Sequence, residues 1–160
     1  MSERKAWDVE TARSRIEALA GLPGALLPIL HAIQDEFSYI DRAAVPLIAE
    51  RLNLSEAEVH GVISFYHDFR EVPPGLHILK ICRAEACQSM GCDATIHRAE
   101  NMLGIRLGET TPDHNFTLEP VYCLGNCALS PAAMLDGKLY GRVRPDVVTS
   151  LIGQTREAIA

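Results

Sequence analysis

Two cysteine pairs are the residues whose type and spacing suggest chemistry in this sequence. Cys82 and Cys87 are separated by four residues, and Cys123 and Cys127 by three. Each pair begins where a strand is predicted to end, so neighbouring strands of one sheet would bring both pairs to the same edge. Four thiolates meeting at that edge would form a soft-metal site, because a bound metal offsets the repulsion between their charges.

The spacing within the pairs favours an iron–sulfur cluster over zinc. Structural zinc sites commonly use two-residue spacers, whereas wider loops suit a two-iron cluster in which each pair holds one iron. Zinc and unligated thiols remain open on spacing alone. A Rieske centre is disfavoured because no histidine lies within three residues of these cysteines, and thioredoxin-type exchange lacks its Cys-x-x-Cys pair. The fifth cysteine, Cys92, is expected to be a buried or half-buried thiol.

The elements that must position these thiols lie in the second half of the chain. Period-two runs predict strands that end at Cys82 and Cys123, and Asp136-Gly137 predicts a hairpin turn. The predicted elements are, in order, strand 76–81, helix 87–103, strand 116–122, hairpin strands 132–135 and 139–143, and helix 145–159. This order predicts an α/β fold in which residues 73–160 form a thioredoxin-like domain, with a helix on each face of a small sheet.

The first half contains no cysteine and has helical periodicity. The predicted helices are 8–20, 23–37, one capped by Asp41, and one that starts at a Ser55–Glu58 capping box and continues its apolar face to Phe69. The run Pro73-Pro74-Gly75 ends this region. Residues 1–72 are therefore predicted to form a small helical bundle domain.

Composition narrows the class of protein. The chain has 160 residues, is 48% hydrophobic and carries 21 acidic against 15 basic residues, which suits a globular core and disfavours nucleic-acid binding. No apolar run approaches a membrane span, and the first eight residues lack the apolar core of a signal peptide. We therefore expect a cytoplasmic protein without direct membrane insertion, in which the cysteines do not form a disulfide framework.

The cysteine motifs resemble a known family. The runs CRAEACQSMG (82–91) and CLGNCALSP (123–131) are similar to the thioredoxin-like [2Fe-2S] ferredoxin family, which includes the 24 kDa subunit of respiratory NADH dehydrogenase. The runs LHAIQDEF (30–37) and GVISFY (61–66) resemble the helical domain of that subunit. The resemblance extends from about residue 14 to residue 155.

The resemblance implies a cofactor and a partner. Cys82, Cys87, Cys123 and Cys127 would ligate one [2Fe-2S] cluster, and the chain would be a non-catalytic electron-transfer subunit. Its partner would be a larger flavoprotein subunit that binds FMN and NADH. Consistent with this division, no Gly-x-Gly-x-x-Gly fingerprint follows a predicted strand here.

The stretch RAEACQ (83–88) most resembles the gamma subunit of NAD-dependent molybdenum formate dehydrogenases. That branch implies a further partner, a formate dehydrogenase subunit that holds the molybdenum cofactor. The equivalent subunits of respiratory NADH-quinone oxidoreductase and NAD-reducing hydrogenase are alternatives. Two other hypotheses are a free-standing ferredoxin, disfavoured by the helical first half, and a zinc-stabilised interaction module.

Overall fold

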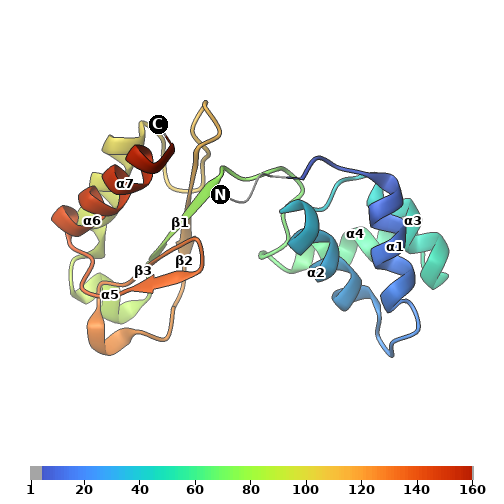
Figure 1. Ribbon diagram of the computed structural model, residues 1–160. Coiled ribbons are helices and arrows are strands. Elements are labelled where there is room, and N and C mark those ends of the chain that lie inside the picture. Colours follow the sequence, from blue (N-terminus) through green and yellow to red (C-terminus); the bar gives the residue numbers. More distant parts are fainter. Residues whose placement is uncertain (1–4, 160) are drawn as a thin grey trace. The chain divides into compact units, whose positions relative to one another are not determined.

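The computed structural model describes residues 5–159 (Figure 1). These residues separate into two compact units, the first ending at Pro73 and the second beginning at Pro74. Met1 to Arg4, the start of the segment expected to lack a signal-peptide core, lie outside the described residues. Independent folding of each unit as a domain stays a prediction. Among the described residues, no helix combines the length and apolarity needed to cross a bilayer.

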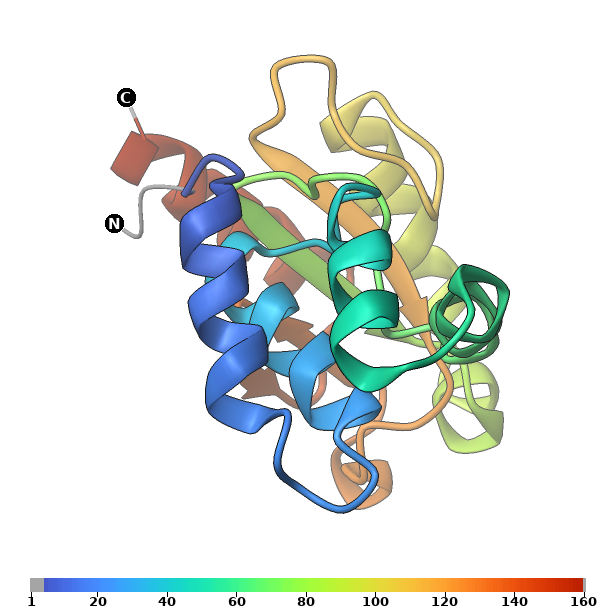
Figure 2. The same ribbon diagram turned by 90° about the vertical axis from the view of Figure 1, so that its right-hand side faces the viewer.

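Helices make up the regular structure described in the first unit, which is coloured blue to green in Figure 2. The Asp8 carboxylate accepts the Thr11 N–H at 2.8 Å and caps the first helix, and Ser55 and Glu58 form the expected capping box at the last. Ser38 and Asn53, both with positive φ, end the two helices between them. The bounds are α1 Val9–Leu19, α2 Leu26–Phe37, α3 Ala44–Leu52 and α4 Glu56–Phe65.

The core of the first unit forms around one face of α2. Leu30, Ile33 and Phe37 follow the helical repeat and are buried against Ile48 of α3 and Ile63 of α4. Burial of such large aliphatic and aromatic side chains is the main free-energy source that holds short helices together.

Two helix boundaries in this unit differ from the sequence prediction. Ala43, rather than Asp41, is the N-cap of α3, and the Asp41 carboxylate instead accepts the Ala43 N–H in the preceding turn. Helix α4 ends at Phe65, so the expected apolar face does not continue to Phe69. The reason is tertiary: the side chain of Gln34 donates to the Asp68 carbonyl and accepts the Arg70 N–H, which replaces further helical bonds.

The second unit contains a mixed sheet that places the cysteine loops. Strand β1 runs parallel to β2 and antiparallel to β3, which pairs with β4 in the order β2-β1-β3-β4. Asp136 and Gly137 both have positive φ in the β3–β4 turn, as the Asp-Gly signal predicts. The strand bounds are β1 His77–Cys82, β2 Phe116–Val121, β3 Ala133–Leu135 and β4 Lys138–Tyr140.

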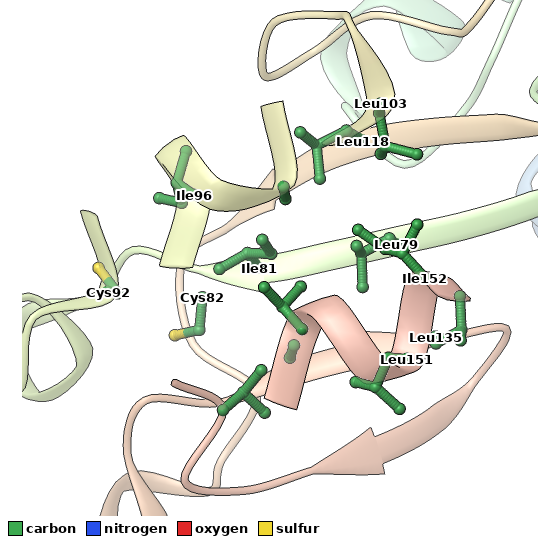
Figure 3. Packing of buried hydrophobic residues seen from close by; sticks show 14 of the residues in the cluster. Leu79, Ile81, Cys82, Cys92, Ile96, Leu103, Leu118, Leu135, Leu151 and Ile152 are labelled. Atoms are coloured by element: carbon green, nitrogen blue, oxygen red, sulfur yellow. The ribbon is translucent and has the colours of Figure 1, made fainter. Parts of the chain in front are cut away.

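The long helices of this unit, α6 (Cys92–Leu103) and α7 (Pro145–Ile159), lie side by side on one face of the sheet (Figure 1). The predicted arrangement, with a helix on each face, is therefore wrong. Leu79 and Ile81 of β1 point to the same face and are buried, whereas Lys80 between them is partly exposed. Since β1 buries its alternate residues on one side, both helices pack there (Figure 3).

The predicted helix 87–103 is two helices. Residues Glu85–Ser89 form α5, and α6 starts only at Cys92. Gly91 separates them with a φ of 80°, which a helix cannot accommodate and which glycine adopts without the cost that a side chain would add. Cys87 and Cys92 consequently lie on different helices.

Candidate metal centre

The first cysteine pair is buried at the carboxyl end of β1. Cys82 is the last residue of the strand, and its N–H donates to the Ala132 carbonyl at 3.0 Å. Cys87 lies on α5, where its N–H donates to the Ala84 carbonyl at 2.9 Å. Each residue is only 2% exposed, and their thiols are hydrogen-bonded to each other. The strand end and the short helix together hold this pair against the core.

The second pair lies in the loop after β2 and is exposed. The sulfur atoms of Cys123 and Cys127 are 3.9 Å apart. A tetrahedral metal with metal–sulfur bonds of about 2.3 Å places two of its sulfur ligands about 3.8 Å apart. The spacing of this pair therefore fits two thiolates bound to one metal ion.

The backbone conformation of the second cysteine loop places an amide donor where it can stabilise an anionic sulfur. Cys123 has a φ of 117° and Gly125 a φ of 71°, so the chain makes a tight turn between the two cysteines. The turn directs the Gly125 N–H at the Cys123 sulfur, at 3.3 Å. Amide donors of this kind stabilise a thiolate or a metal-bound sulfur.

The parallel pairing of β1 and β2 brings the two pairs to the same end of the sheet. Cys82 is in register with Val121, two residues before Cys123. The backbone N–H groups of Cys123 and Leu124 hydrogen-bond to the Cys82 thiol, and the charge of Cys82 acts on Cys127. All four cysteines named from the sequence therefore meet at one edge.

Burial and neighbouring groups shift the pKa values of Cys82, Cys87 and Cys127. Burial alone raises the pKa of Cys82, but donation from the Ala84 amide, the Cys87 thiol and the second loop outweighs it and lowers this pKa. Burial, together with the hydrogen bond and charge of the neighbouring Cys82, raises the pKa of Cys87 to about 11. The hydrogen bond and charge of Cys123 raise the pKa of Cys127. Each pair thus retains a proton at neutral pH, and metal binding would release it.

The four cysteine side chains are arranged as two separate pairs. Within residues 5–159, no three His, Cys, Asp or Glu side chains form a group that could hold a single metal ion. Two thiol pairs joined by amide donors, with the sulfurs of the second pair spaced for one metal, suit a centre with two metal ions bridged by sulfide. The donor set therefore fits a thiolate-ligated two-iron cluster.

Cys92 belongs to neither of the two pairs. It is fully buried at the start of α6 among apolar neighbours, which confirms the expected buried thiol (Figure 3). Burial raises the pKa of Cys92, and the adjacent Asp93 raises it further. A thiol in that environment is a small apolar side chain rather than a nucleophile.

Two features of the site were missed by sequence reasoning. The Ala132 N–H hydrogen-bonds to the Cys87 thiol from the segment that leads into β3, after the cis Ser130–Pro131 peptide bond. The Arg83 side chain buries its Nε beside the first pair without a hydrogen-bond partner among the described residues. Neither contact has a local sequence signal, because each depends on segments brought together by the fold.

The sheet, the one-sided helix pair and the two thiol pairs define a thioredoxin-like protein with a thiolate metal centre. A family model of the thioredoxin-like [2Fe-2S] ferredoxins matches residues 12–156. Because the match covers most of the sequence, the chain belongs to the thioredoxin-like [2Fe-2S] ferredoxin family, whose members carry a [2Fe-2S] cluster.

Individual relatives agree with this assignment. One of the NADH-quinone oxidoreductase subunits of Pseudomonas aeruginosa is 37% identical over 147 residues, covering 89% of each protein. The HndA subunit of the NADP-reducing hydrogenase of Solidesulfovibrio fructosivorans is 34% identical over 139 residues, which cover 87% of this chain and 81% of HndA. A solved NAD+-reducing [NiFe]-hydrogenase in the air-oxidized state matches with a TM-score of 0.74 and 25% identity, over 92% of this chain and 24% of the hydrogenase chain.

Proposed function

We propose that this chain is an electron-transfer subunit of an NAD-linked oxidoreductase complex and that Cys82, Cys87, Cys123 and Cys127 ligate its [2Fe-2S] cluster. The observation that carries the proposal is the meeting of the two thiol pairs at the carboxyl end of β1 and β2. The names of the relatives, subunits of NADH-quinone oxidoreductase and of a pyridine-nucleotide-linked hydrogenase, support the kind of complex.

When bound, the cluster supplies a centre that takes up and returns single electrons. The chain's own contribution is to control the charge at this centre. The N–H groups of Ala84, Leu124 and Gly125 donate to cysteine sulfurs, and such donors favour the more negative, reduced state. The low dielectric around the buried pair opposes added charge, so these donors offset the cost of burial.

The two cysteine pairs differ in solvent exposure, and this difference indicates the side from which a partner can reach the site. Cys82 and Cys87 are enclosed, whereas Cys123 and Cys127 reach the surface beside Tyr122, which is 72% exposed. A redox partner would therefore approach from the side of the second loop. We propose that this partner is the FMN- and NADH-binding flavoprotein subunit, which exchanges hydride with nicotinamide while this chain exchanges single electrons with the flavin.

We further propose that the complex oxidises formate. The support is the RAEACQ stretch (83–88), part of which forms α5 around Cys87. A partner subunit with a molybdenum cofactor would then supply the electrons. Respiratory NADH-quinone oxidoreductase and NAD-reducing hydrogenase are the alternative complexes, and the relatives named above belong to these two kinds.

The ligand assignment is tested on the chain purified without oxygen. We expect about two irons and two acid-labile sulfides per chain, a coloured protein, and a rhombic paramagnetic signal that appears only after reduction with dithionite. A colourless protein with one zinc would contradict the proposal, because zinc thiolate does not absorb visible light, and would leave an interaction module instead.

The choice of complex is tested by isolating the chain with its native partners through an affinity tag. The formate proposal predicts a molybdenum-containing complex that reduces NAD+ with formate and contains FMN. Nickel with hydrogen-dependent activity, or quinone reduction by NADH without molybdenum, would assign the chain to one of the alternatives. Isolation of the cluster-loaded chain without any flavoprotein would favour a free-standing ferredoxin.

A further inference from the structure

Arg83 occupies an unusual position between the two ligands of the buried pair. Its Nε atom is buried and has no hydrogen-bond partner among residues 5–159. The side chain as a whole is 39% exposed, so atoms of Arg83 other than Nε reach solvent. A buried N–H without an acceptor is costly, and such groups are rare in native proteins.

The ion pair with Asp93 does not account for this atom. The Arg83 Nη2 is 3.9 Å from the Asp93 carboxylate, which is too long for a hydrogen bond, and the contact involves Nη2 rather than Nε. The Asp93 side chain is 65% exposed, so the attraction is screened by water. The guanidinium therefore retains donor capacity that the described residues do not use.

The backbone of Arg83 is held from both sides. Its N–H donates to the Val121 carbonyl at 2.8 Å, and its carbonyl accepts the side-chain amide of Gln88 at 2.9 Å. The first bond ties Arg83 to the end of β2 and the second to α5. The side chain thus emerges from a fixed point, directly after Cys82 and next to both cysteine loops.

We propose that Arg83 tunes the reduction equilibrium of the bound cluster. Its Nε–H donates to an anionic sulfur of the cluster and favours the reduced state. The proposal rests on the ligand assignment under Proposed function. Four thiolates around a ferric [2Fe-2S] core give a net negative unit, and one added electron increases that charge. A guanidinium that donates to the bound cluster would therefore be worth more in the reduced state than in the oxidised one, and it would raise the reduction potential.

The test is an anaerobic redox titration of the full, cluster-loaded chain with three variants. Arg83→Gln removes the charge and the Nε donor, Arg83→Lys keeps the charge without the planar donor, and Asp93→Asn removes the ion-pair partner alone. We expect Arg83→Gln to lower the ratio of reduced to oxidised cluster about tenfold at a fixed potential, equal to about 59 mV for one electron. Arg83→Lys should lie between Arg83→Gln and the unmodified chain, and Asp93→Asn should remain within threefold of the latter.

A second readout reports the hydrogen bond directly. Iron–sulfur stretching bands in resonance Raman spectra shift in deuterated buffer when an exchangeable N–H donates to sulfur. We expect a component of that shift to disappear in Arg83→Gln and Arg83→Lys and to persist in Asp93→Asn. A signal of this kind is independent of any activity of the complex.

Several outcomes would overturn the role of Arg83. One is an Arg83→Gln potential equal to that of the unmodified chain, and another is an Asp93→Asn shift as large as that of Arg83→Gln. If Arg83→Gln does not retain a cluster, an unchanged potential and deuterium shift in Arg83→Lys would refute the proposal. Failure of the unmodified chain to hold about two irons would instead refute the ligand assignment.

Discussion

At the scale of residues, the two cysteine pairs differ in burial, and we expect them to contribute differently to cluster binding. Cys82 and Cys87 are enclosed by the core, where burial and the neighbouring Cys82 raise the pKa of Cys87 to about 11, whereas Cys123 and Cys127 lie at the surface. Under the proposed ligand assignment, the enclosed pair would anchor a bound cluster to the sheet, and the exposed pair would present it to a partner. Loss of either pair should therefore abolish binding, for different structural reasons.

Cys123→Ala and Cys92→Ala form a matched test of the ligand set. We expect Cys123→Ala to lose the cluster and to destabilise its loop, because one of two paired sulfurs is missing. Cys92→Ala should keep the cluster and lower the free energy of unfolding by about 1 kcal/mol, since it leaves a small cavity in the core. Iron and sulfide content measure the first effect and denaturant unfolding the second. Equal loss of iron in both variants would refute our ligand assignment.

At the scale of elements, the loop that carries Cys127 is supported from the segment after β4. Cys127 begins the 3-10 helix η1 (Cys127–Leu129), and the Arg142 N–H donates to the Leu129 carbonyl at 2.6 Å. Gly141 lies against the same turn with no room for a side chain: an added Cβ would be 2.6 Å from Leu129 Cβ and 3.0 Å from Asn126 Nδ2. The position of Cys127 thus depends on a close approach that only glycine permits.

Gly141→Ala should displace η1 and loosen the second cysteine pair. We expect a loss of unfolding free energy of about 1–3 kcal/mol from overpacking, together with faster loss of iron to a chelator. Gly153→Ala in α7 is the control, because a Cβ there meets no atom within 4 Å and alanine favours a helix interior by about 1 kcal/mol. Thermal unfolding and chelator kinetics distinguish the two. Unchanged chelation in Gly141→Ala would show that η1 is not held by this contact.

Helix α4 begins with a cap whose strength depends on pH. Donation from the Ser55 backbone N–H and hydroxyl lowers the pKa of Glu58 below its usual 4.5. The contribution of the cap is therefore complete above pH 4.5 and is lost as the pH falls through the lowered pKa. We expect Glu58→Gln to reduce stability at neutral pH and to remove this part of the acid dependence, as measured by unfolding at a series of pH values. Glu56→Gln, in the same first turn, should retain the acid dependence.

At the scale of the whole molecule, the described chain places all of its cysteines in the second unit, after Pro74. The first unit has its own core around α2 and contributes no thiol to the site. Cluster binding should therefore stabilise the two units unequally.

Removal of the cluster from the full chain tests this division. Comparison of the loaded and cluster-free protein by amide hydrogen exchange should show lost protection in the loops around residues 82–87 and 123–127 and in the strand ends that carry them. Protection within α1 to α4 should change little, because their hydrogen bonds and core lie in the other unit. A comparable loss of protection in both units would show that they unfold together.

The sequence by itself determined what depends on near neighbours along the chain. The strand end at Cys82, the Asp136-Gly137 turn and the Ser55–Glu58 cap were all predictable, because periodicity, turn residues and capping act over a few residues. The second strand was also predicted, but it ends at Val121, two residues before Cys123. The cysteine pairs also identified the family, since their motifs are local.

Tertiary structure decided the features that join distant segments. It placed both long helices on one face of the sheet, ended α4 through Gln34, and brought the Ala132 amide to Cys87. It also left the Arg83 Nε buried without a partner among the described residues. These outcomes depend on which apolar face is buried and which backbone groups meet across the fold, and such long-range pairings leave no periodic or short-range trace in the sequence.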